Sequence, residues 1–267
     1  MQFISLITPF VGLFFIFSFF ILDTSLVFSN VMPEISKELS NDMTRVLEKK
    51  VRFQTVFGNC PTRLIGNLTI NLVEEFSKNF SLKDVKLKIL NEGLAEKYFL
   101  SEYNIKYDPL KKQLYLGYDC PTPILKVSVY EKDKTQVYQA VLVENGKLLD
   151  PTYEMILKEE NKLNTQLPML SIPKSEVANE IPKNLAILVK KISSRFRENI
   201  SELIISEDKE LTIILSMDGN PISAFLGKDD WEQKVIQLKR IVEYLNTKQK
   251  KPSLINLSNR KKVVVKF

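Results

Sequence analysis

The chain has 267 residues, 44% of them hydrophobic and 26% charged, with a formal net charge of +6. These proportions are typical of a folded globular protein and exclude disordered and fibrous chains. There is no histidine, there are only two cysteines, and none of the eight glycines forms a GxGxxG or GxxxxGK[ST] pattern. Histidine-dependent, zinc-dependent and nucleotide-dependent enzymes are therefore disfavoured, and we predict no catalytic residue, no cofactor and no metal site.

The first 22 residues carry no charged side chain and consist mostly of Phe, Ile and Leu. At 1.5 Å per residue, about 20 helical residues cross the roughly 30 Å core of a bilayer. We predict a transmembrane anchor over 1–22, with the bulk of the chain across the membrane from the cytoplasm. A cleaved secretory signal is the alternative, with 27–29 as its cleavage site, but the apolar stretch is long and no basic residue precedes it.

Residues 23–50 are expected to link this anchor to the first domain. Behind Pro33, the apolar residues Ile35, Leu39 and Met43 follow one another at helical spacing. The pattern predicts a juxtamembrane helix over 33–50.

Residues 51–131 predict a small domain of strands and helices. An alternating strand over 51–57 is followed by a helix over 67–78 and a second helical stretch over 84–103. Two more strands are expected at 112–118 and 125–130. The predicted order is strand, helix, helix, strand, strand.

Beyond residue 131 the sequence predicts more strands with packed helices. A strand over 137–143 leads into the hairpin turn Asn145-Gly146, and a helix carries Leu185 through Phe196 on its apolar face. The clearest helix runs from Trp231 to Leu245, with Asp229 and Glu232 spaced like a capping box. The further expected strands cover 203–205, 211–215, 222–226, 253–257 and 262–267. The fold class is α+β.

The two cysteines occur in similar local sequences, Asn59-Cys60-Pro61-Thr62 and Asp119-Cys120-Pro121-Thr122. In an oxidising compartment a Cys60–Cys120 disulfide would close the first domain. Two buried thiols that never meet are an equally good reading of the sequence.

The order of elements over 51–131 resembles a POTRA domain, and the motifs after it resemble the FtsQ/DivIB family of bacterial cell-division proteins. The resemblance follows the whole chain, through a Pro-Ile-Leu strand ending in Glu, an "LP-x-L" element, and the family's closing "LG…K…L…IDL…vaV" pattern. These motifs stand at 121–131, 142–147, 167–170, 226–238, 255–257 and 263–266. Asn256 stands where an Asp is usual and Ser258 where an Arg is frequent.

The resemblance implies a bitopic divisome protein of the cytoplasmic (inner) membrane, with a POTRA-like domain over 51–131 and a β domain over 132–267. It implies a non-enzymatic scaffold at the division septum that binds the FtsB/FtsL pair and helps control septal peptidoglycan synthesis. The family's partner adds along the last strand, which maps to Lys262, Val263, Val264, Val265, Lys266 and Phe267.

A terminal strand gives this mapping a physical basis, because its backbone N–H and C=O groups can pair with another chain and Phe267 can anchor it. The alternative is that Val263 and Val265 only fill the core and the edge is covered. The basic residues between Lys248 and Lys262 could meet an acidic partner or membrane headgroups, or could simply be solvated.

Two other functions stay open. One is a secreted or membrane-tethered POTRA-like binding or transport-assembly module. The other is a carboxylate-based hydrolase, which is disfavoured because adjacent acids such as Asp229 and Asp230 do not face each other across a substrate.

Overall fold

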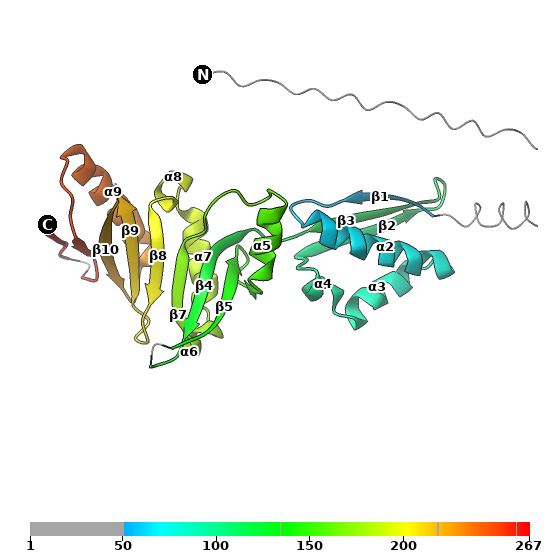
Figure 1. The fold of residues 1–267 in the computed structure, drawn as a ribbon, viewed down its shortest axis with the longest axis horizontal. Coiled ribbons are helices and arrows are strands. Elements are labelled where there is room, and N and C mark those ends of the chain that lie inside the picture. The colour runs from blue at the N-terminus through cyan, green and yellow to red at the C-terminus, as the bar shows by residue number, and fades with distance from the viewer. Residues whose placement is uncertain (1–50, 134, 218, 260) are drawn as a thin grey trace, which may run out of the picture. The chain divides into compact units, whose positions relative to one another are not determined.

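The computed structural model describes residues 51–133, 135–217, 219–259 and 261–267, which form a mixed α+β structure with two sheets (Figure 1). The predicted anchor over 1–22 and the predicted helix over 33–50 lie outside these residues. In the part that is described, no helix has both the length and the apolar character to cross a bilayer.

The first sheet has three strands in the order β1-β3-β2, with β1 parallel and β2 antiparallel to β3. Its apolar core contains Leu68, Leu72 and Phe76 from a long helix, together with Leu114 and Leu116 from the central strand, all at most 1% exposed. The elements are β1 (Arg52–Val56), α2 (Thr62–Asn79), α3 (Leu82–Asn91), α4 (Leu94–Lys97), β2 (Glu102–Asp108) and β3 (Gln113–Asp119).

The predicted helix over 84–103 is wrong in its second half. Helix α3 ends at Asn91, because the chain takes a left-handed backbone conformation at Gly93 (φ 59°). The short helix α4 follows, and a second left-handed residue, Phe99 (φ 57°), comes after it. Strand β2 follows and becomes the strand that completes the three-stranded sheet. The strand predicted at 125–130 exists as β4 (Pro123–Tyr130), but it pairs in the second sheet.

The second sheet has nine strands in the order β12-β11-β10-β9-β8-β7-β4-β5-β6. The pairs β4–β7, β7–β8 and β10–β11 are parallel, and the others are antiparallel. After β4, the strands are β5 (Gln136–Val143), β6 (Leu148–Leu149), β7 (Met169–Pro173), β8 (Ile200–Ile205), β9 (Leu211–Met217), β10 (Asn220–Gly227), β11 (Leu254–Asn256) and β12 (Val264–Lys266).

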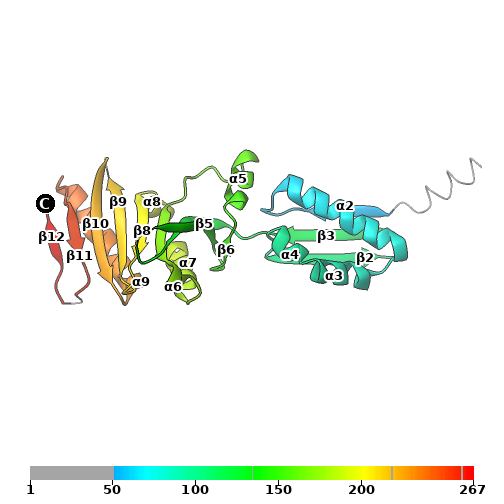
Figure 2. The same cartoon turned by 60° about the horizontal axis from the view of Figure 1, so that its bottom comes forward.

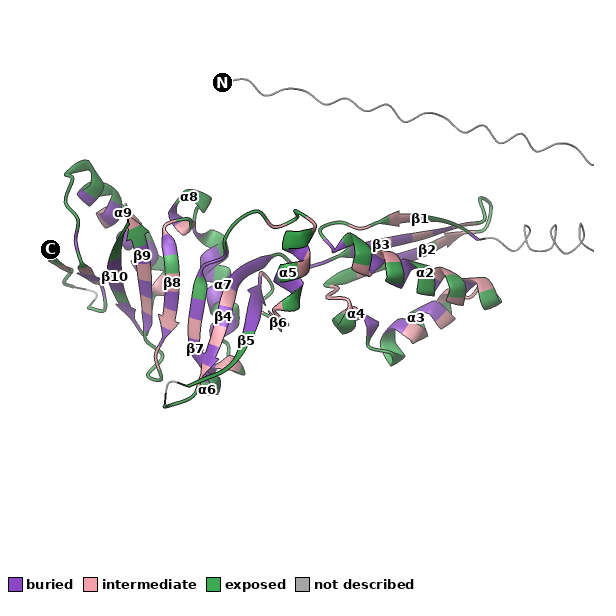
Figure 3. Ribbon diagram, in the orientation of Figure 1, coloured by how far each residue is buried: buried purple, intermediate pink, exposed green. Residues whose placement is uncertain are grey.

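Helices cover one face of this sheet (Figure 2). Leu185 and Val189 of one helix and Leu238 of another are buried against inward strand residues such as Ile213 and Ala224, and Figure 3 shows this buried layer. The helical part of this region comprises α5 (Thr152–Glu159), α6 (Lys174–Val177), α7 (Ile181–Lys191), α8 (Ser194–Arg197) and α9 (Trp231–Thr247). The helix expected through Phe196 therefore ends at Lys191, and Phe196 belongs to α8.

The predicted hairpin after β5 is confirmed. Gly146 has a φ of 84°, its N–H donates to the Val143 carbonyl at 2.8 Å, and Asn145 accepts from the Lys147 N–H at 3.0 Å.

Strand β5 packs on both faces, because Leu142 belongs to the core of the nine-stranded sheet and Val143 to the core under the three-stranded sheet.

The structure joins Cys60 to Cys120 by a disulfide, with the sulfur atoms 2.11 Å apart and the Cα atoms 4.9 Å apart. The bond links the loop after β1 to the end of β3. Both residues are at most 1% exposed, so the bridge is shielded from solvent. A disulfide of this kind fits an oxidising compartment.

The segment from α5 to Lys162, which sequence patterns did not reveal, connects the two sheets. The Glu160 carboxylate accepts hydrogen bonds from the backbone N–H groups of Thr62 at 2.5 Å and Arg63 at 3.0 Å. The Lys162 ammonium donates to the Cys60 carbonyl and, at 2.8 Å, to the Thr62 hydroxyl. Glu160 thus caps α2, whose own N-cap residue is Pro61 and offers no side-chain acceptor. We call residues 160–162 the α5 hook.

Burial alone would raise the pKa of Glu160, but hydrogen bonds from Arg63, Thr62 and Lys162 outweigh it and hold the pKa of this carboxyl below its usual range.

Candidate functional site

The carboxyl-terminal strand lies at an edge of the nine-stranded sheet. Strand β10 leads through helix α9 into β11, which pairs parallel to β10, and the chain then reverses so that β12 pairs antiparallel to β11. Among the strands that the structure describes, β12 has β11 as its only neighbour (Figure 2). Its other side therefore presents backbone groups that no described strand pairs.

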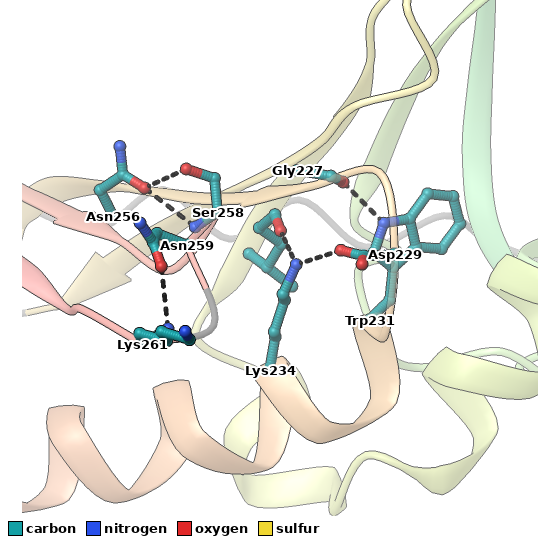
Figure 4. A network of polar contacts seen from close by, with 9 residues as sticks. Gly227, Asp229, Trp231, Lys234, Asn256, Ser258, Asn259 and Lys261 are labelled. Carbon is teal, nitrogen blue, oxygen red and sulfur yellow. Dashed lines mark hydrogen bonds and ion pairs between the residues drawn. The ribbon is translucent and has the colours of Figure 1, made fainter.

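The turn from β10 into α9 is held by three side-chain contacts (Figure 4). The Trp231 indole N–H donates to the Gly227 carbonyl at 2.8 Å. The Lys234 ammonium, in a side chain only 5% exposed, donates to the Leu226 carbonyl at 2.7 Å and pairs with Asp229 at 2.6 Å. These bonds tie the first turn of α9 to the end of β10.

The predicted capping box at 229–232 is wrong. The N-cap residue is Asp230, in a left-handed conformation with φ 51° and without a side-chain cap bond. The Asp229 carboxylate instead forms an ion pair with the buried Lys234 ammonium. A buried cation without a charged or polar partner costs more free energy than an uncapped helix end in solvent.

Gly227 brings the end of β10 close to the loop after β11. Its φ is 76°, and a Cβ at this position would lie 3.2 Å from the Ser258 Cβ. The Leu257 N–H donates to the Phe225 carbonyl at 2.8 Å, and Leu257 is 1% exposed. The "LG" of the sequence pattern therefore permits the close packing that fixes the end of β11.

Two asparagines shape the reversal between β11 and β12 (Figure 4). The Asn256 side-chain oxygen accepts from the Ser258 N–H at 2.9 Å and its hydroxyl at 2.6 Å. The Asn259 side-chain oxygen accepts from the Lys261 N–H at 2.8 Å. An aspartate accepts the same bonds, so the departure at Asn256 keeps the turn while removing a negative charge.

The residues of β12 alternate between two sides. Val265 pairs with Ile255, which is fully buried, and it packs against the core, whereas Val264 is 37% exposed. Val263 is exposed to the same extent, so the sequence-based alternative in which Val263 and Val265 both fill the core applies to Val265 alone. The edge itself is not covered by any strand that the structure describes.

The last residue offers an aromatic surface beside this edge. Phe267 is 68% exposed, and the Lys250 ammonium lies 5.5 Å from its ring centroid. Lys262 and Lys266, the two cations of the predicted site, are also exposed. Of the predicted strand over 262–267, the structure forms Val264–Lys266 as β12, and Lys262, Val263 and Phe267 flank it. Together they present backbone groups, exposed apolar surface and positive charge at the end of one sheet.

Sequence reasoning missed what supports this edge. The sequence analysis included Lys234 only as part of a motif and did not predict its burial. The signal was its position, because a lysine three residues after Trp231 lies on the apolar stripe of α9. Within residues 51–267, apart from the three undescribed positions, no group of three His, Cys, Asp or Glu side chains is placed to hold a metal ion.

Comparison with known proteins adds one finding. No curated protein matches the chain. The region from 133 to 258 begins in the turn between β4 and β5 and ends with the Ser258 contact to Gly227. Residues 133–258 match the family model described as cell division protein FtsQ/DivIB, C-terminal, and the match supports that family and, with it, a role in cell division.

Proposed function

We propose that this protein is a non-enzymatic scaffold of the bacterial divisome that binds the FtsB/FtsL pair outside the cytoplasmic membrane and helps control septal peptidoglycan synthesis. Residues 1–22 would anchor it as a single-pass protein at the division septum, and the region over 51–131 would act as its POTRA-like domain.

One observation carries the proposal: β12 is an edge strand that follows directly after the region matched to the family. A partner strand can add to such an edge through main-chain hydrogen bonds, with side-chain contacts supplying specificity. Exposed Val264 and Phe267 give the partner apolar surface beside the backbone. The buried disulfide agrees with a location outside the cytoplasm.

The test is capture of the FtsB/FtsL pair from the same organism by the full-length chain in detergent. Val264→Glu and Phe267→Ala should abolish capture, because one places a charge beside the docked strand and the other removes its aromatic anchor. Leu110→Glu is the matched control, since Leu110 is 94% exposed in the turn between β2 and β3.

Capture by the two edge variants at the wild-type level, with unchanged unfolding curves, would contradict the proposal. A fluorescent fusion of the full chain should also gather at midcell, and uniform membrane fluorescence would count against the division role.

A further inference from the structure

The positive charge of this protein is concentrated at the candidate edge. Residues 248–267 contain seven Lys or Arg and no Asp or Glu, a charge of +7, whereas the whole chain carries +6. The first 247 residues therefore hold 31 basic and 32 acidic side chains and are nearly neutral. Of these seven cations, Lys266 belongs to β12, three directly precede that strand at positions 260–262, and three stand between α9 and β11.

Three of these cations lie beside the edge without an ion pair to any acid that the structure describes. No ion pair to a described acid is formed by Lys261, Lys262 or Lys266, all of which are exposed. Many other exposed lysines of the molecule do pair, for example Lys191 with Glu232 at 2.7 Å. The positive charges of these three lysines can therefore interact with a partner.

The lysines also have a fixed spacing relative to the backbone. Val265 points into the core, so Val264 and Lys266 point to the opposite face of the sheet. Lys262 lies two residues before Val264, just outside β12, and a chain kept extended through Val263 brings it to the same side. A strand added to β12 therefore meets lysine, valine and lysine in alternation on this face.

We propose, resting on the proposed function, that the strand accepted by β12 belongs to a polypeptide with acidic and apolar residues in alternation, so that carboxylates lie beside Lys262 and Lys266 and an apolar side chain lies beside Val264. Directly opposed side chains of paired strands have Cβ atoms about 5 Å apart, close enough for opposite charges to attract and like charges to repel.

The same lysines exclude wrong partners. Charged residues on an edge strand, lysine above all, discourage pairing with unrelated strands. A second copy of β12 would place lysines against lysines, and this repulsion disfavours self-association of the chain. The lysines therefore favour an acidic strand over a second copy of β12.

The experiment measures binding of synthetic peptides of about eight residues, the length of a natural strand, to the full-length chain in detergent. The probes are an alternating Glu-Val peptide, an alternating Lys-Val peptide, and a peptide with the Glu and Val residues in two blocks. The charge variant is Lys262→Glu/Lys266→Glu, and its matched control is Lys83→Glu/Lys86→Glu on exposed positions of α3.

The alternating acidic peptide should bind roughly tenfold or more tightly than the other two, and the edge variant should lose at least that factor while the control keeps it. Raising the ionic strength from ~0.1 M to ~1 M, which shortens the Debye length from about 10 Å to about 3 Å, should weaken this binding. The edge variant should in turn prefer the Lys-Val peptide.

Equal binding of the three peptides, or equal losses in both variants, would overturn the inference. So would lysine-dependent binding to phosphatidylglycerol vesicles combined with no binding of the acidic peptide, since the charge would then serve a lipid surface. If Val264→Glu abolishes capture of the FtsB/FtsL pair but the charge variant does not, the acidic-strand inference fails while the proposed function stands. If neither variant affects capture, both fail.

Discussion

The α5 hook gives a sharp prediction about stability. In Glu160→Gln, the side chain loses its charge and replaces one of the two acceptor oxygens with an NH2 donor, so with the side chain in its present position one of the two backbone N–H groups of α2 loses its acceptor. Loss of a helix cap is worth about 1 kcal/mol, and a hydrogen bond to a charged group is worth about 1.5–3 kcal/mol. The Glu160 side chain is 14% exposed, so solvent screens it little.

We therefore expect Glu160→Gln to lower the free energy of unfolding by about 1–2 kcal/mol, measured by urea unfolding at neutral pH. Glu159→Gln is the matched control, because Glu159 is an exposed neighbour on the same helix. Equal stabilities of Glu160→Gln and the control would refute the view that the carboxylate caps α2.

The effect should depend on pH with a defined sign. Because the folded protein lowers the pKa of Glu160, its contribution is complete above the unfolded value of about 4.3 and is lost as the pH falls through the folded value. The stability difference between wild type and Glu160→Gln should therefore shrink at acidic pH. A difference that grows as the pH falls would contradict the assignment.

Two further changes test the supports of the fold. Cys120→Ser should lower the free energy of unfolding by about 2–4 kcal/mol. Because Cys60 and Cys120 are buried, a reductant should not reduce their disulfide in the wild-type protein until the protein unfolds. Rapid reduction of the native protein would contradict this. Lys234→Ala should cost about 1–3 kcal/mol in thermal or urea unfolding, since it leaves a buried carbonyl without its donor. Lys239→Ala, on the exposed side of the same helix, should cost less than about 1 kcal/mol, and equal costs would argue against the buried tie.

The sequence predicted the helices and strands whose apolar residues recur at a regular period. Strand β4 and helix α9 were found because their apolar residues recur at two and at 3.6 residues, and the Asn145-Gly146 turn was found because few other residues tolerate its backbone. The helix expected through Tyr103 failed because a left-handed residue such as Phe99 leaves no compositional trace.

Long-range relations account for the rest. The sheet to which β4 belongs, and the capping of α2 by Glu160 from nearly one hundred residues away, depend on tertiary packing that no local pattern encodes. For the candidate site, the sequence supplied the residues through a motif, but the edge position of β12 follows only from the order of strands in the sheet.

The most direct test of the central claim is amide hydrogen exchange of the full-length chain with and without the FtsB/FtsL pair. We expect the pair to slow exchange at 262–267 and to leave β7, in the middle of the sheet, unchanged. Protection that arises elsewhere while 262–267 exchange at the free rate would contradict docking at this edge.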